Sequence, residues 1–134
     1  MYQAWIAVVD ASHARWFQFE RSEDETGVHE QMTERGHLAN HHHHDSRDHH
    51  RDRADATFAR SALEHFRDAC RDSGVARVVL CAGPRMLGHL RTAAAEILPA
   101  SLDVVEVAHE LATLTPAQIR THLSHDHVLP AHQS

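Results

Sequence analysis

The stretch Val78–Arg91, VVLCAGPRMLGHLR, decides the fold class of this chain. It begins with five apolar residues in a row, a pattern typical of a strand buried on both faces. A Gly-Pro pair follows, and Pro84 suits the first turn of a helix, where its missing N–H costs nothing. Apolar residues then recur at spacings that share one helix face, and Gly88 within this helix predicts a close approach to the sheet beneath. The stretch therefore predicts the strand–turn–helix step of an α/β domain.

Length and composition predict one domain. The chain has 134 residues, of which 42% are hydrophobic, enough for a single core. It contains no apolar run near the roughly 18–20 residues that span a bilayer, and polar residues arrive by Asp10, unlike in a signal peptide. We therefore expect a cytoplasmic protein without a membrane partner. Cys70 and Cys81 form no CxxC pair and are interpreted as small core residues.

The charge of the chain argues against a general nucleic-acid binder. All 13 basic residues are Arg, and the formal net charge is −6 with the 16 His neutral. A strong basic field is absent at neutral pH, so no DNA partner is expected, and any RNA contact would be local and based on Arg.

The pattern along the chain predicts a mixed sheet with an N-terminal hairpin and about three helices. We expect a single α/β domain over residues 1–123, a flexible His-rich loop over residues 36–53, and a polar tail over residues 124–134. Thr115 to Gln118 is a capping-box pattern with Pro at the first helical position. The expected strands are Ala4–Asp10, Arg15–Glu20, Val28–Arg35, Ala76–Ala82 and Asp103–Ala108, and the expected helices are Ala54–Ser73, Pro84–Leu98 and Pro116–Leu123.

Several segments together resemble a known family. The segments are Trp5–Ala11 with Ala14–Phe17, the Phe58-Ala59 pair, the block Val79–Arg91, and Glu110–Pro116 (ELATLTP). They are similar to segments of the bacterial host-attachment proteins, small relatives of the middle domain of archaeal and eukaryotic peptide-chain release factors. The resemblance implies a release-factor-like mixed sheet flanked by helices, and a ribosome or tRNA as partner.

The resemblance also implies where an active loop would lie. In release factors, the loop between the N-terminal strands and the long helix carries Gly-Gly-Gln and promotes peptidyl-tRNA hydrolysis. Here residues 36–53 contain no Gly-Gly-Gln, and the chain offers no recognisable catalytic set. The leading hypothesis is therefore a non-enzymatic interaction protein, associated with translation or tRNA, and a hydrolase is the weakest alternative.

The His-rich loop is the strongest chemical signal. Imidazole and carboxylate suit Zn²⁺ or Ni²⁺, although consecutive His residues impose no fixed geometry. Three further interpretations stay open: a solvated linker without a function, an internal expression tag and a catalytic loop. A metal-binding or metal-buffering protein is accordingly the alternative function, and the tail residues His125, Asp126 and His127 could add ligands. The predicted ligands are His41, His42, His43, His44, Asp45, Asp48, His49 and His50.

A second candidate site lies where the central strand meets its helix. Gly83 and Arg85 place free N–H groups and a guanidinium at a helix N-terminus, where anions bind. Ligands also favour the carboxyl edge of open α/β sheets. Gly83, Arg85 and Arg91 are the predicted anion or ligand contacts, and ordinary helix capping with surface charge is the alternative.

Overall fold

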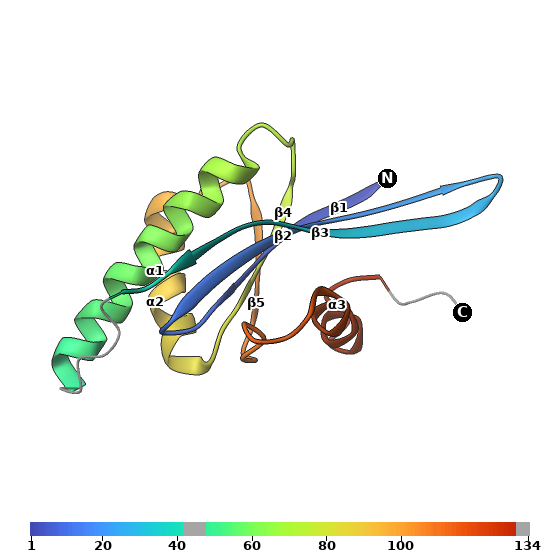
Figure 1. Cartoon of the computed structure of the whole chain (residues 1–134). Coiled ribbons are helices and arrows are strands. Elements are labelled where there is room, and N and C mark those ends of the chain that lie inside the picture. Colours follow the sequence, from blue (N-terminus) through green and yellow to red (C-terminus); the bar gives the residue numbers. More distant parts are fainter. Residues whose placement is uncertain (42–47, 131–134) are drawn as a thin grey trace.

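The computed structural model describes residues 1–41 and 48–130, and within them a sheet is covered by helices on both faces (Figure 1). The elements follow one another along the chain in the order β1, β2, β3, α1, β4, α2, β5, α3. Their bounds are β1 Tyr2–Val9, β2 His13–Asp24, β3 Gly27–Ala39, α1 Asp48–Cys70, β4 Arg77–Cys81, α2 Pro84–Ile97, β5 Asp103–Val107 and α3 Pro116–His125.

The sheet is mixed, with strand order β3-β2-β1-β4-β5. β1 pairs antiparallel with β2, and β2 pairs antiparallel with β3, so the first half of the sheet is a meander. β4 pairs parallel with β1, and β5 pairs parallel with β4. Each parallel step requires a crossover, which α1 and α2 supply. Both crossover helices pack on one face of the sheet, and α3 lies on the other (Figure 1).

β4 shows why both faces need cover. Val78 and Leu80 point into the core under α1 and α2, whereas Val79 and Cys81 point into the core under α3. All four are fully buried. The unbroken apolar run thus serves two cores at once, because successive side chains of a strand point to opposite faces.

The structure confirms the predicted fold class: one domain, a mixed five-stranded sheet with an N-terminal hairpin, and three helices over the described residues. α2 begins at Pro84 as predicted. α3 carries the predicted capping box, in which Thr115 and Gln118 each accept a hydrogen bond from the other's backbone N–H. No helix in the described part of the chain is long and apolar enough to cross a membrane.

The predicted loop over residues 36–53 is wrong at both ends. β3 continues to Ala39, because residues 36–39 keep pairing with β2 and Leu38 packs against the core. α1 begins at Asp48, six residues before the predicted start. The polar residues before Ala54 are compatible with a helix, because a helix needs apolar residues on one face only. Asp52 also ties the first turns of α1 to α2, through His89 and Arg85.

Two smaller expectations also need correction. Gly88 makes no close approach, since a Cβ built on it would meet nothing within 4 Å. The close approaches occur at Gly36, over the Trp16 ring, and at Gly83, beside Glu110. The tail is packed at its start: α3 runs to His125, and Leu129 beyond it is buried against the core under α3.

Candidate interaction surface

The most distinctive surface is a long hairpin formed by β2 and β3. The last pair between β1 and β2 joins Tyr2 to Arg21, but β2 and β3 keep pairing as far as Asp24 and Gly27. The final pairs of the hairpin therefore have no third strand beside them, and the hairpin extends away from α1 and α2 in Figure 1. A two-stranded hairpin is marginal in water on its own, so this one needs support from the rest of the protein.

The hairpin is strongly acidic. Residues 20–34, here called the acidic hairpin, hold six carboxylates against the single cation of Arg21, with His29 counted as neutral. The carboxylates at the tip are exposed. This one segment therefore carries most of the net charge of −6. The six carboxylates belong to Glu20, Glu23, Asp24, Glu25, Glu30 and Glu34.

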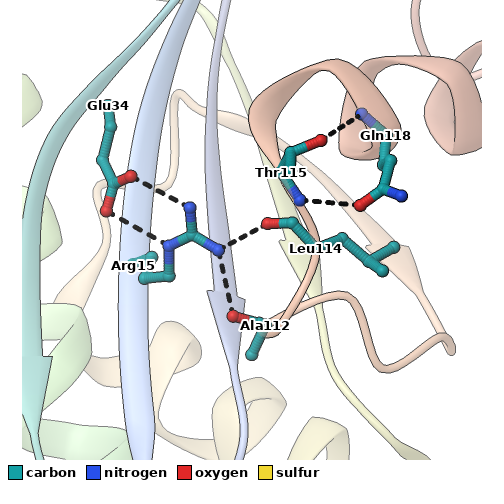
Figure 2. A network of polar contacts seen from close by, with 6 residues as sticks. All are labelled: Arg15, Glu34, Ala112, Leu114, Thr115 and Gln118. Carbon is teal, nitrogen blue, oxygen red and sulfur yellow. Dashed lines mark hydrogen bonds and ion pairs between the residues drawn. The ribbon is translucent and has the colours of Figure 1, made fainter.

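Arg15 ties the hairpin to the connector that leads into α3 (Figure 2). Its guanidinium donates to both carboxylate oxygens of Glu34 on β3, at 3.1 and 2.9 Å. Nη1 donates to the backbone oxygens of Ala112 and Leu114, at 3.0 and 2.7 Å. The bidentate pair fixes direction as well as distance. One side chain of β2 therefore holds β3 and the connector together.

Arg120 of α3 makes a second contact of the same kind further along the hairpin. It donates to both carboxylate oxygens of Glu30, at 3.2 and 2.7 Å, and to the Ser124 hydroxyl. Its guanidinium lies over the Phe19 ring, with Cζ 4.7 Å from the ring centre. Arg120 is only 5% exposed. The hairpin is thus held at two points along β3, to the connector through Arg15 and Glu34 and to α3 through Glu30 and Arg120.

The turn of the hairpin is ordered by Asp24. Its Oδ1 accepts hydrogen bonds from the Thr26 backbone N–H at 2.8 Å and from the Thr26 hydroxyl at 2.5 Å, and it lies 3.1 Å from His29 Nε2. The Thr26 hydroxyl bond is the main cause that lowers the pKa of Asp24. Arg15 likewise lowers the pKa of Glu34. Both carboxylates therefore stay negatively charged at neutral pH.

A family model matches residues 29–123, from β3 to the last turn of α3. Its description is "Protein required for attachment to host cells". The match covers well over half of the chain, including most of β3, the connector and Arg120, whereas Arg15 and β2 lie outside it.

This chain belongs to the host-attachment family.

Two further comparisons add little. No curated protein matches this host-attachment protein. Among solved structures, RuvC of Thermus thermophilus is similar at 14% identity and a TM-score of 0.44. The likeness covers 77% of this chain and 60% of RuvC, so this chain spans less than two thirds of that protein. The predicted relationship to release factors stays a prediction.

The predicted anion contacts of the host-attachment protein do not converge. Arg85 pairs with Asp52 of α1 at 3.3 Å, whereas Arg91 pairs with Glu106 of β5 at 2.5 Å. Gly83 does cap α2, but the Glu110 carboxylate lies 2.7 Å from where a Cβ of Gly83 would be. Carboxylates thus already occupy the surroundings of these groups. The geometry favours helix capping and surface charge, and the anion site stays a prediction.

The predicted metal ligands fall mostly outside what the structure describes. His42, His43, His44 and Asp45 lie outside the described residues. His41 is exposed in a turn, and Asp48, His49 and His50 form the beginning of α1. Among residues 1–41 and 48–130, no group of three His, Cys, Asp or Glu is arranged to hold a metal. Metal binding by this segment stays a prediction.

The sequence pointed to part of the acidic hairpin. The strand expected over Val28–Arg35 falls within β3. The roles of Arg15 and Arg120 were missed, because each pairs with a carboxylate far away in the sequence. The sequence gives only weak evidence for these pairs. Two arginines lie beside apolar positions of a strand and a helix, and two glutamates lie four residues apart on β3.

Proposed function

We propose that this host-attachment protein is a non-enzymatic interaction protein whose acidic hairpin docks onto a basic surface of a protein partner. The single observation that carries the proposal is the geometry of this hairpin. Three of its six carboxylates, those of Glu23, Asp24 and Glu25, lie in the part that extends past the body of the sheet, where a partner can reach them. Complementary charge of this kind steers encounters and suppresses wrong partners.

The internal contacts support a recognition role because they hold the hairpin in place with two of its carboxylates and leave those at the tip accessible. Glu30 and Glu34 pair with Arg120 and Arg15, which hold the base of the hairpin. Glu23, Asp24 and Glu25 at the tip are exposed. A surface held in place before binding loses less conformational freedom on association than a mobile one.

The distribution of arginine favours a protein partner over RNA. Phosphate backbones are bound by clustered Lys and Arg side chains. In this chain, many of the cations that the structure describes face carboxylates of the same chain: Arg15, Arg21, Arg60, Arg77, Arg85, Arg91 and Arg120 each lie within 4.0 Å of one. An association with translation, which the resemblance predicts, would then run through a basic protein rather than through tRNA.

A charge-matched capture experiment tests the proposal. The wild-type chain and a tip variant, Glu23→Gln, Asp24→Asn and Glu25→Gln, are immobilised and exposed to extract of the native host. A control variant carries Glu64→Gln, Asp68→Asn and Glu96→Gln, which make the same change in charge on exposed positions of α1 and α2. Retained proteins and RNA are quantified, with and without ribonuclease.

We expect the wild-type chain and the control variant to retain the same basic proteins in equal amounts. The tip variant should retain at least tenfold less of them. All three chains should melt at nearly the same temperature, because the substituted side chains are exposed and the amide oxygen left by Asp24→Asn can still accept hydrogen bonds from Thr26. Equal retention by the tip variant would contradict the proposal. Retention that disappears with ribonuclease would point to RNA as the partner instead.

A further inference from the structure

Two histidines and an aspartate meet beside the last turn of α3. His109 lies in the connector after β5, and its Nε2 is 3.5 Å from Oδ2 of Asp126, the residue that caps the C-terminus of α3. The ring of His122 lies one helical turn before Asp126, with its centre 6.3 Å from that of His109. The side chains of His109 and Asp126 are accessible, at 57% and 35% exposed. A dissolved ion can therefore reach them.

The backbone at all three positions is held in place. Val107 and Leu111 on either side of His109 are buried. Asp126 donates its backbone N–H to the His122 oxygen at 3.1 Å, which ties these two residues to each other. The chain then turns back, and the N–H groups of Val128 and Leu129 bond to the Leu123 oxygen. The three side chains thus project from fixed points.

The separation of His109 and Asp126 fits a shared metal ion. Zn–N and Zn–O bonds of about 2.0–2.2 Å in a tetrahedral site place neighbouring donor atoms about 3.3–3.6 Å apart. The observed 3.5 Å lies in that interval, and it is long for a hydrogen bond, which is commonly about 2.7–3.2 Å. Two imidazoles on one tetrahedral ion would have ring centres roughly 5 Å apart.

The rings of His109 and His122 are therefore further apart than two imidazoles that share one ion. The His109 and His122 ring centres stand 6.3 Å apart, and as the described side chains lie, no three of them form a closed metal site. His122 is an exposed residue on the helix surface. A turn of its side chain about the χ angles covers a gap of this size without moving the backbone.

The thiol beneath the site does not take part. Cys81 is fully buried, and burial, with a smaller contribution from the charge of Asp126, raises the pKa of its thiol to about 12. A fully buried thiol is also closed to a dissolved ion. The available donor set is then two imidazoles and one carboxylate, which suits Zn²⁺, Ni²⁺ or Cu²⁺ and leaves a coordination position open.

We propose that His109, His122 and Asp126 form a binding site for one divalent transition-metal ion, with Zn²⁺ as its representative. The site is separate from the predicted ligands of residues 41–50, which lie before and at the start of α1. It is also independent of the proposed role of the acidic hairpin. Failure of either proposal leaves the other standing.

Zinc titration of the full chain tests this site, provided that the His-rich segment is silenced first. In the silenced chain, His41–His44, His49 and His50 are replaced by Ser. Isothermal titration at pH 7.5 is then repeated with His109→Ala, His122→Ala or Asp126→Asn added singly. We expect one zinc ion per silenced chain, bound at least tenfold more weakly after each single change, because each removes a ligand.

His37→Ala serves as the control, since His37 is an exposed histidine on β3, and it should leave zinc affinity unchanged. Circular dichroism without metal shows whether each variant is folded. In the wild-type chain, zinc should shift the ring resonances of His109 and His122 together. A silenced chain that binds no zinc at about 100 µM, or one whose affinity survives the loss of His109 and His122, would overturn the proposal.

Discussion

β4 and the acidic hairpin are held in the sheet by different forces. β4 has five residues, and four of them are fully buried between two layers of helices. β3 has 13 residues, is charged and largely exposed, and keeps its place through pairing with β2 and through two arginines. β4 is stabilised mainly by the removal of apolar surface from water, whereas β3 is stabilised by specific polar contacts. The difference teaches that the core specifies the fold, while the surface most suited to recognition rests on a few side chains.

The largest effect is expected in β4. Leu80→Ala should lower the free energy of unfolding by about 2–5 kcal/mol, because it leaves a cavity at a fully buried position of the central strand. Urea denaturation measures the change. A loss below about 1 kcal/mol would show that the two-sided core is less tightly packed than the comparison requires.

The arginine contacts should have a smaller, local effect. Arg120→Ala removes a buried guanidinium from Glu30 and from the Phe19 ring, and should cost about 1–3 kcal/mol. Hydrogen exchange should accelerate in β3 near Glu30 while β4 keeps its protection. If β4 loses protection to the same extent, the hairpin and the core are one cooperative unit and the comparison fails.

A still smaller effect should appear on acidification. The pKa of Glu34 is lowered by Arg15 from its ordinary 4.5, so the ionised carboxylate stabilises the fold fully above about pH 4.5. This contribution, about 0.5–1 kcal/mol for a partly exposed pair, is lost as pH falls through the lower folded pKa. Thermal melts of the wild-type chain and Glu34→Gln should therefore differ at pH 6 and converge as the pH falls below the lowered pKa of Glu34. A constant difference in stability would show that the charge on Glu34 contributes nothing.

The same contrast explains how far the sequence predicts the structure. The predicted bounds of β4 and α2 differ from the observed ones by a single residue at most, because burial on defined faces leaves a periodic apolar pattern. The ends of β2, β3 and α1 were misjudged by several residues, since their exposed ends carry polar residues that are also typical of loops. Gly36 illustrates the difficulty: the sequence predicts a loop there, yet Gly36 pairs within the sheet and the Trp16 ring covers it.

The candidate sites were harder to predict, since they depend on contacts between distant residues. Arg15 reaches the Ala112 and Leu114 oxygens, and His109 reaches Asp126, only after the connector has packed. No local spacing encodes such pairs. Local sequence did reveal the acidity of the hairpin tip and the capping of α3, both of which lie within a few consecutive residues.

The most direct test of the central claim maps where a cation docks. The ¹⁵N-labelled full chain is titrated with a lysine-rich decapeptide, and amide shifts are followed by NMR for the wild-type chain, the tip variant and the control variant. If the acidic hairpin is the recognition surface, the amide shifts concentrate in residues 20–31 and disappear in the tip variant. The control variant then behaves like the wild-type chain. Shifts centred on the carboxylates of α1 and α2, or shifts that persist in the tip variant, would contradict the claim that the acidic hairpin is the recognition surface.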